Sequence, residues 1–404
     1  MKSLRELLLL GPGPSSSHTI APYRIAKDFL FRHEREGLSD IVVVLRGSLS
    51  LTGKGHRTDQ VLKNAFQDYT IEVVFDQGTE HLKHPNTLVL KAKTKSGKEL
   101  EETYYSLGGG AFRRVGDRKK TKDCYPFSTF DGMKEYMRKE NIEDPTLVIE
   151  RFEGKEIWDF SKNLLKHSFA TIERGLQDSS LLPGPLKVQP VSAKIFKQAQ
   201  KFPEEGERLL LLLSSYAYAT SEENARGREV VTAPTCGSSG VVPALLYYGM
   251  QREKRDIDSL SKAYLVGAMM ANFIKENASL SGAVLGCQAE IGSACSFAAA
   301  SYSSLMGLCL HQIEYASEVA MEHFLGLTCD PVDGYVQVPC IERNAMAAVH
   351  AYTSYLFAKD IAPCRSNLVS FDNVVRAMKL TGKELPSSLK ETSLGGLAKV
   401  IHIC

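Results

Sequence analysis

The chain has 404 residues, of which 43% are hydrophobic, 24% charged and 8% aromatic. This length predicts two or three domains, and the ordinary apolar content excludes disorder as the main state. Lys and Arg number 49 against 47 Asp and Glu, so the net charge of +2 argues against a nucleic-acid partner. The nine cysteines lack the dense pattern of a small secreted scaffold, which indicates a reducing, cytoplasmic setting.

No segment is expected to enter a membrane. The leucine run at residues 7–10 is shorter than the apolar region of a secretory signal. Two later stretches without charge, residues 230–251 and 291–313, are rich in Ser, Gly and Cys. A membrane span needs about 20 predominantly apolar residues, so these stretches predict buried helices and their loops.

The first part of the chain predicts an α+β domain, residues 1–156. Helical periodicity at residues 20–33 precedes a series of β-rich runs, and Ser96-Gly97 predicts a hairpin turn between the last two. Short connections favour a mainly antiparallel sheet with helices on one face, ending at the glycines of residues 108–110. The expected strands are 41–45, 69–75, 87–93 and 99–106.

From residue 157 onward the β pattern fades, and residues 157–404 predict a larger all-α helical domain. Several of its helices are apolar nearly all round, as is typical of the central helices of a bundle. Cys309 falls inside one of these apolar runs, which favours a packing role for its thiol. The expected helices are 157–176, 207–218, 259–274, 296–319 and 344–358.

Two hydroxyl-rich segments, one in each predicted domain, are candidates for binding a small carboxylic acid. Helix N-termini offer free N–H groups to a carboxylate, although one Ser or Thr is enough for ordinary capping. The pattern therefore leaves binding and capping open. The candidates are Ser15, Ser16, Ser17 and His18 in the first segment, and Thr235, Cys236, Gly237, Ser238 and Ser239 in the second.

A further histidine, His56, follows Gly53 and Gly55 in a glycine-containing segment shortly after a predicted strand. The segment is not a phosphate-binding Walker loop, because Lys54 is followed by Gly55 rather than by Ser or Thr. Histidine is the side chain best suited to proton transfer near neutral pH. On these residues alone, however, an incidental histidine in a surface turn is the better interpretation.

Three cysteines share a turn-like context between predicted helices: Cys287, Cys329 and Cys340. Their spacing is neither that of a ferredoxin nor that of a zinc C-x-x-C pair. Three interpretations stay open on spacing alone: buried small side chains, a thiol nucleophile, or three ligands of one metal centre. For any single cysteine, inert packing is the commonest role.

Taken together, these segments resemble the iron–sulfur L-serine dehydratase (L-serine ammonia-lyase) family in its single-chain form. The family's layout of a β-type domain followed by an α-type domain agrees with the division predicted above. The similar motifs extend in order over nearly the whole chain: GPSSSHTIAPYRIA, GSLSLTGKGHRTD, TYYSLGGG, IERGL, TAPTCGSSGVVPALL, KENASLSGAVLGCQAEIGSACS and GLTCDPVDGYVQVPCIERNAMAA.

The resemblance implies that Cys287, Cys329 and Cys340 bind three irons of a [4Fe–4S] cluster and leave one iron open to L-serine. An open iron acts as a Lewis acid, whereas a cluster with four cysteine ligands has no site for substrate. It also implies His56 as the base that takes the Cα proton, with His18 as second choice, and places the hydroxyl segments around the substrate's carboxylate and ammonium. The implied products are pyruvate and ammonia, formed by a cytoplasmic homodimer active in amino-acid degradation and gluconeogenesis.

The chain also departs from the family pattern. Ala289 stands where the family has Gly, Asp333 and Tyr335 alter a loop, and Cys236 replaces an Asn or Ala. These changes put the loop shapes and substrate contacts in question but remove no cysteine ligand. The resemblance further implies that the terminal Cys404 caps the open iron in the resting enzyme, until substrate displaces it.

Three other functions remain open from the sequence. An enzyme of the same architecture can act on L-threonine or L-cysteine, because one methyl group in a pocket changes discrimination by only about 1–3 kcal/mol. A cluster-bearing amino-acid sensor without turnover is a rival of another class. A cluster-free protein with packed cysteines is the third.

Overall fold

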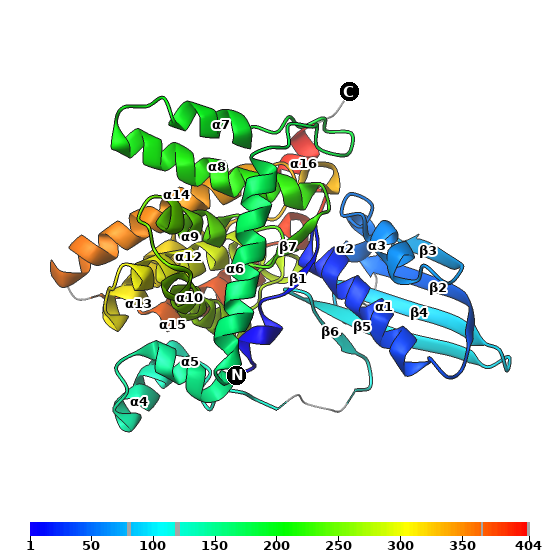
Figure 1. Ribbon diagram of the computed structural model, residues 1–404. Helices are drawn as coiled ribbons and strands as arrows, with labels where there is room; N and C mark the ends of the chain where they lie inside the picture. The colour runs from blue at the N-terminus through cyan, green and yellow to red at the C-terminus, as the bar shows by residue number, and fades with distance from the viewer. Residues whose placement is uncertain (79–81, 118–121, 365–366, 402–404) are drawn as a thin grey trace.

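The computed structural model describes residues 1–78, 82–117, 122–364 and 367–401. It consists of an N-terminal α+β part and a larger helical part, which lie side by side in Figure 1. The predicted fold class is confirmed. Among the described helices, none combines the length and apolar character needed to cross a lipid bilayer.

A five-stranded sheet in the order β3-β2-β4-β5-β6 forms the α+β part (Figure 1). Only the β2–β3 pair is parallel, so the sheet is mainly antiparallel, as expected. The predicted Ser96-Gly97 turn is present between β4 and β5, where Gly97 has a φ of +82°. The strands are β2 (Leu38–Gly47), β3 (Ile71–Asp76), β4 (Asn86–Thr94), β5 (Glu99–Gly108) and β6 (Ala111–Arg114).

Two helices, α1 (Ala21–Arg32) and α3 (Thr58–Ala65), cover one face of this sheet. Alternate residues of β4 point toward them, and the shared core includes Phe29, Leu62 and Leu88. Burial of such a side chain contributes about 1.5–3 kcal/mol each. This core holds in place the helical turn before α1 and the loop before α3, which carry His18 and His56 respectively.

The glycines at 108–110 do not end the sheet, contrary to the prediction. They form the turn from β5 to β6, where all three have positive φ. A Cβ atom at Gly108 would lie 3.0 Å from the backbone nitrogen of Ser281. The absence of a side chain therefore lets the sheet approach the segment of the helical part that leads to Cys287.

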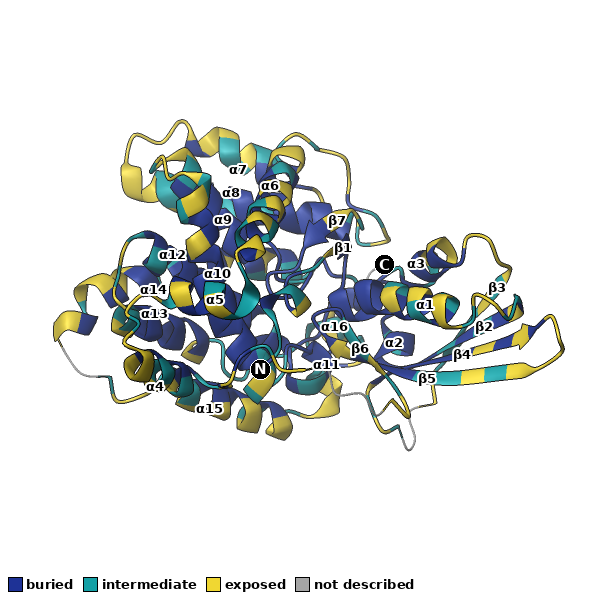
Figure 2. Ribbon diagram, turned by 60° about the horizontal axis from the view of Figure 1, so that its bottom comes forward, coloured by how far each residue is buried: buried dark blue, intermediate teal, exposed yellow. Residues whose placement is uncertain are grey.

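One buried helix, α12 (Ile291–Leu305), forms the centre of the helical part (Figure 2). A glycine of a neighbouring helix lets that helix approach α12 closely: a Cβ atom at Gly267 would lie 2.4 Å from the carbonyl oxygen of Phe297 in α12. Around it pack α9 (Val241–Gln251), α10 (Ile257–Asn277), α13 (Leu310–Glu322) and α14 (Cys340–Asp360), with α6 (Glu156–Gly175), α7 (Ser192–Ala199), α8 (Glu205–Ala225) and α15 (Phe371–Glu384) outside them.

The single helix predicted at residues 296–319 is wrong. The chain forms α12 and α13 instead, and Gly307 (φ +78°) provides the left-handed residue that commonly ends a helix. Cys309 lies in this break as the N-cap of α13 and is exposed. The expectation that its thiol packs inside a helical core is therefore also wrong.

Segments from both halves of the chain join the two parts. Leu4 and Leu7 belong to the core of the helical part, and β1 (Leu10–Pro12) then pairs with β7 (Glu229–Val231), a strand inside the predicted all-α half. The helices α4 (Phe130–Glu140) and α5 (Pro145–Glu153) also contribute to that core. The division predicted between residues 156 and 157 falls at the start of α6, and residues before it also contribute to the core of the helical part.

Candidate active site

An enclosed cavity between the two parts brings together the three predicted cysteines and one of the predicted histidines. Cys287 and Cys329 are buried, and Cys340 is half-buried. No disulfide links them; all three are free thiols. The cavity is lined by Pro14, Ser15, His56, Gly237, Cys287, Glu290, Ile291, Cys329, Pro331, Val336, Cys340 and Glu391.

Two helix N-termini hold two of these thiols. Cys287 precedes α12 by one turn and receives a hydrogen bond from the backbone N–H of Ile291. Cys340 is the first residue of α14. Helix N-termini carry partial positive charge and unpaired N–H groups, which favour thiolates.

A guanidinium adds further positive charge to this cluster. The pKa of Cys287 lies well below the ordinary thiol value because Cys329 donates a hydrogen bond to it and Arg343 lies nearby. The pKa of Cys329 is correspondingly raised, by the same hydrogen bond and by burial. Cys287 is therefore the more acidic thiol of this pair. Metal binding requires thiolates, so this environment suits a metal.

The C-terminal segment reaches the cavity through the backbone of Cys329. Its N–H donates to the carbonyl of Leu389 at 2.9 Å, and its carbonyl accepts from the N–H of Thr392 at 3.2 Å. This short parallel bridge places Glu391 in the cavity wall. Glu391 adopts a left-handed conformation (φ 48°) and also lines a second, more open cavity on its other side.

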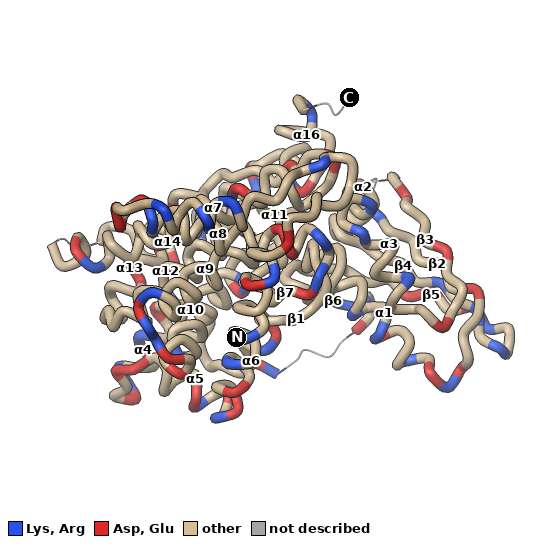
Figure 3. The backbone as a smooth tube through the Cα atoms, turned by 45° about the horizontal axis from the view of Figure 1, so that its top comes forward, with Lys and Arg blue, Asp and Glu red and all other residues tan. Residues whose placement is uncertain are grey.

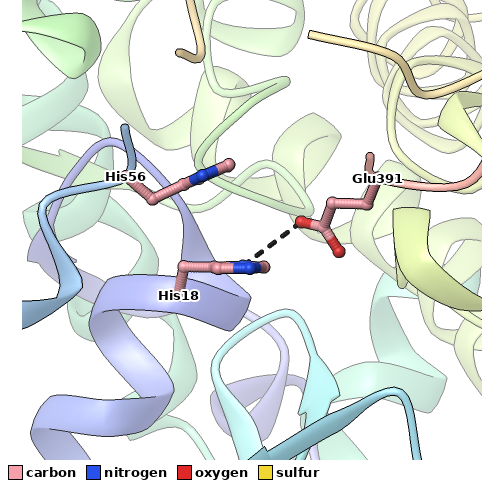
Figure 4. A group of neighbouring side chains, drawn as sticks. All are labelled: His18, His56 and Glu391. Atoms are coloured by element: carbon pink, nitrogen blue, oxygen red, sulfur yellow. Dashed lines mark ion pairs between the residues drawn. The ribbon is translucent and has the colours of Figure 1, made fainter. Parts of the chain in front are cut away.

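The predicted histidines lie face to face on the other side of the cavity (Figure 4). His18 lies in a helical turn, Ser16–Ile20, and His56 lies in the loop between α2 (Ser48–Leu51) and α3. Their ring centroids are 4.3 Å apart with an interplanar angle of 23°. Gly55 allows the His56 loop to reach the helical part, since a Cβ there would lie 2.6 Å from the carbonyl oxygen of Gly334.

The hydrogen bonds of His56 define its tautomer. Its Nδ1 lies 2.7 Å from the carbonyl oxygen of Thr52, which can only accept, so Nδ1 carries the proton. Burial, together with the neighbouring His18, lowers the pKa of His56 to about 3. The ring is therefore neutral near pH 7, and its Nε2 has a lone pair available to accept a proton.

His18 has polar partners on both ring nitrogens. Its Nε2 contacts the Thr52 hydroxyl at 2.9 Å and the Ser48 carbonyl at 3.1 Å. Its Nδ1 lies 2.9 Å from the Ser17 hydroxyl and 3.3 Å from Oε1 of Glu391. Burial lowers the pKa of His18 to about 4 and raises the pKa of Glu391. Both shifts favour the uncharged forms of the two groups.

The first hydroxyl segment is a helical turn rather than a loop. The Ser15 side chain caps this turn by accepting from the N–H of His18, and Ser15 also lines the cavity. Ser17 donates to Glu391 at 3.1 Å and so lies within the histidine network. Ser16 is buried in the same turn.

The second hydroxyl segment places only Gly237 among the residues that line the cavity. Thr235 and Ser238 are hydrogen-bonded to each other at 2.9 Å, and Ser239 is buried. Cys236 packs in a small apolar cluster with Ile20 and Val230, away from the cavity lining.

Sequence reasoning missed three charged residues here: Glu290, Arg343 and Glu391. Glu290 and Arg343 lie inside the cysteine motifs quoted above, three residues after Cys287 and Cys340 respectively. A charged residue inside an apolar, cysteine-containing motif was the available signal for both. Glu391 lies far from these motifs in sequence, and only the backbone bridge to Cys329 reveals it.

Comparison with known proteins decides the family. Residues 86–398 match the serine dehydratase alpha chain family, and residues 3–66 match the serine dehydratase beta chain family. The chain belongs to the serine dehydratase family. Among its relatives in this family, an L-serine dehydratase of Streptomyces coelicolor is 37% identical, over 100% of this chain and 99% of that protein.

Other relatives within the serine dehydratase family are similarly close. L-serine dehydratase 2 of Escherichia coli K12 is 34% identical, over the full length of both chains. An L-serine dehydratase of Helicobacter pylori J99 is 36% identical over 99% of each chain. The similarity therefore includes both the part that carries the histidines and the part that carries the thiols.

Two groups of donors in this serine dehydratase family member could hold a metal cofactor. One is the set of three cavity thiols. The other consists of His18, His56 and Glu391, whose candidate ligand atoms lie within 4.8 Å of one another. Cys404, the predicted cap of the metal centre, lies outside the described residues.

Proposed function

We propose that this chain is an L-serine dehydratase that converts L-serine to pyruvate and ammonia. The observation that supports this most is the cavity itself, which is lined both by three thiols and by a neutral histidine. A metal held by thiolates and a base on the opposite wall are the two components that β-elimination of water from serine requires. The names of the relatives support the same substrate.

Cys287, Cys329 and Cys340 are the residues that would hold the cofactor, a [4Fe–4S] cluster. When bound there, a four-iron cluster with three thiolate ligands supplies an open Lewis-acid site for the serine hydroxyl and carboxylate. The donor chemistry fits, because two thiols lie at helix N-termini and Arg343 neutralises thiolate charge. Soft thiolate donors favour iron–sulfur clusters over Mg²⁺ or Ca²⁺.

The histidine pair suits proton transfer better than metal binding. An ion bound by both rings must lie near both ring planes, but stacked planes at 23° do not converge close to the nitrogen atoms. His56 therefore acts as the base: Nε2 takes the Cα proton while Nδ1 donates to the Thr52 carbonyl. His18, held by Thr52 and Glu391, orients the pair and is the second candidate for the base.

The hydroxyl segments complete the substrate site. Ser15 and Gly237 line the cavity and contact the substrate, while Ser17 acts through Glu391 and His18. Ser16, Thr235, Cys236, Ser238 and Ser239 support these segments from behind the cavity lining. Loss of the Cα proton and of hydroxide gives aminoacrylate, which tautomerises to an imine, and water converts the imine to pyruvate and ammonia.

The deciding experiment is anaerobic purification followed by iron and sulfide analysis and a product assay. We expect about four irons and four sulfides per chain on full loading, and pyruvate as the product from L-serine. Parallel assays with L-threonine and L-cysteine measure 2-oxobutyrate and sulfide and so rank the three substrates. Protein without iron or sulfide after reconstitution would disprove the cluster, and a loaded protein without pyruvate formation would disprove the activity.

The arrangement of the whole enzyme is also part of this proposal. We propose a cytoplasmic homodimer, in agreement with free thiols that need a reducing compartment, and sedimentation of the loaded protein measures its oligomeric state. Cys404 is the residue that would cap the open iron at rest and shield it from oxygen, as the family resemblance implies. A chain without Cys404 is therefore expected to lose activity faster in air, and equal lifetimes with and without Cys404 contradict the cap.

A further inference from the structure

Two carboxyl side chains, Glu290 and Glu391, line the cavity between the two parts, and they have different partners. Glu391 is engaged by the histidine side, through Nδ1 of His18 and the hydroxyl of Ser17. Glu290 lies on the thiol side, where one of its oxygens is 3.9 Å from Sγ of Cys329. A Cβ atom placed on Gly282 would lie 3.2 Å from Oε2 of Glu290, so the α11 segment (Gly282–Leu285) packs closely against this carboxyl.

Glu290 has no cationic partner within 4.0 Å in the described part of the chain. Its polar partners are the hydroxyl of Thr235 and the thiol of Cys329. The nearby guanidinium of Arg343 is engaged elsewhere, by the Thr328 carbonyl at 2.8 Å and by Asp330 at 3.6 Å. Burial disfavours an unpaired charge on Glu290 and raises the pKa of this carboxyl well above its ordinary value, so the cationic group of a ligand beside it would offset that cost and stabilise its charged form.

The proposed substrate carries such a cation at the right place. If the hydroxyl and carboxylate of serine are directed toward the thiol cluster, the α-ammonium is only two bonds from the carboxyl carbon and lies close to the same cluster. Glu290, which lines the cavity and lies 3.9 Å from the Cys329 thiol, is the carboxyl placed to be its partner. We infer that Glu290 binds the α-ammonium group of the amino-acid substrate, an inference that rests on the proposed dehydratase function.

This role makes Glu290 a specificity-determining residue. A 3-hydroxy acid without the amino group offers the same hydroxyl and carboxylate but leaves the carboxylate of Glu290 unpaired. Sites that hydrogen-bond a polar substrate group discriminate strongly against analogues without it. The inference therefore predicts an enzyme selective for amino acids over hydroxy acids, with the selectivity located at one side chain.

The experiment compares binding of L-serine and of 3-hydroxypropanoate to the anaerobic, iron-loaded full-length chain. We expect the wild-type chain to prefer serine by at least about 100-fold, since a site built for a polar group rejects analogues without it. Glu290→Gln keeps the shape and removes the charge, so serine affinity falls and the preference shrinks at least about tenfold. Glu290→Asp keeps the charge and retains part of the preference, which separates charge from shape.

Glu391→Gln is the matched control, since it changes the other carboxyl of the same cavity. Its expected effect is on proton removal through His18, with the preference for serine retained. The inference is overturned if folded, iron-loaded Glu290→Gln keeps the full preference, or if this variant loses its iron, because Glu290 is then a metal ligand. A loaded wild-type chain that neither binds nor converts serine overturns the proposed function instead, and this inference falls with it.

Discussion

Each cavity thiol is fixed by the backbone around it rather than by its own packing alone. Cys340 begins α14 and Cys287 lies one turn before α12, whereas the N–H and C=O groups of Cys329 are both bonded to the C-terminal segment. Such thiols cannot move away to compensate when one of them is lost. This is why the ligand set can be tested one residue at a time.

We expect Cys287→Ala, Cys329→Ala and Cys340→Ala each to lower the iron content and to reduce turnover at least about 100-fold, because one lost ligand exposes the whole cluster to exchange. Cys309→Ala is the matched control, since this thiol is exposed in the break between α12 and α13. Iron and sulfide per chain are the measurement. A stable, fully loaded cluster in any of the first three variants would contradict its assignment as a ligand.

Proton abstraction gives the second test at the residue scale. His56→Ala is expected to keep the cluster and to bind serine, but to slow exchange of the Cα hydrogen with solvent by about 10²–10⁴-fold, the usual contribution of a positioned base. Proton NMR of serine in deuterated water measures this exchange. Normal exchange in His56→Ala would move the role to His18, whose Nδ1 faces Glu391.

The charge state of both histidines is a third prediction. With pKa values of about 4 for His18 and about 3 for His56, both rings stay neutral from pH 5 to pH 8. Nitrogen-15 NMR of labelled histidine, assigned with His18→Gln and His56→Gln, checks this directly. A ring that titrates near pH 6.5 contradicts the burial that we describe.

The same pKa values predict how the free energy of unfolding changes with pH. An unfolded histidine titrates near pH 6.5, so between pH 6.5 and pH 4 the unfolded chain binds the proton that folded His18 refuses. The free energy of unfolding therefore falls on acidification, by about 3 kcal/mol for His18 over that range. The raised pKa of Glu391 has the opposite sign, because its contribution is present at low pH and is lost as the pH rises.

At the scale of elements, local pattern predicted the strands and long helices well. The alternation of apolar residues predicted β4, and the long apolar run predicted α10. Both patterns are informative because they reflect which faces of an element are buried. The break at Gly307 was missed, since the apolar pattern continues on both sides of it. A glycine ends a helix by adopting positive φ, which periodicity does not report.

The candidate site shows the same limit. The thiols and histidines were found because their residue types are chemically distinctive and occur in motifs. Glu391 was missed because its place depends on a backbone bridge between Cys329 and Lys390, which are far apart in sequence. Likewise, the sequence showed Cys236 among hydroxyls, whereas its side chain packs against Ile20. Long-range pairing and side-chain direction are set by tertiary structure.

One turn links the sheet to the thiol side, and it can be tested with a matched pair of glycines. Gly97 and Gly108 both have positive φ, so an alanine costs about 1–2 kcal/mol of backbone strain at either site. Gly97 has open space around it, whereas a Cβ at Gly108 would press on Ser281. Gly108→Ala is therefore expected to cost a further 1–3 kcal/mol or so in the free energy of unfolding, by urea denaturation. Equal costs for the two variants contradict the close contact.

At the scale of the whole molecule, the site exists only where the two parts meet. The sheet part supplies the histidines, and the helical part supplies the thiols and Glu290 (Figure 1). Acidic and basic residues are interspersed along the backbone of both parts, with neither sign confined to one of them (Figure 3). Their relative placement therefore depends on specific contacts at the junction, such as the β1–β7 pair, rather than on attraction between oppositely charged parts.

Two buried asparagines allow the effect of the junction contacts on activity to be separated from their effect on stability. Asn224 at the end of α8 donates to the carbonyl of Pro14 at 2.9 Å, just before the turn that carries Ser15 and His18. Asn272 in α10 donates to the carbonyl of Lys2, also at 2.9 Å, in a part of the N-terminal segment that does not line the cavity. Replacement by alanine removes a similar anchor in each case and costs about 1–3 kcal/mol.

The two variants should then differ in function although they resemble each other in stability. Asn224→Ala is expected to lower kcat at least about tenfold, because displacement of the His18 turn by as little as about 1 Å is enough to misalign the base. Its iron content should be normal, because all three thiols lie in the helical part. Asn272→Ala should keep both kcat and iron. Turnover and iron per chain are measured for both variants, each beside urea denaturation. Equal kcat in the two variants would mean that the thiol side alone determines the rate. Loss of iron in Asn224→Ala would mean that the sheet part is needed to form the metal centre itself.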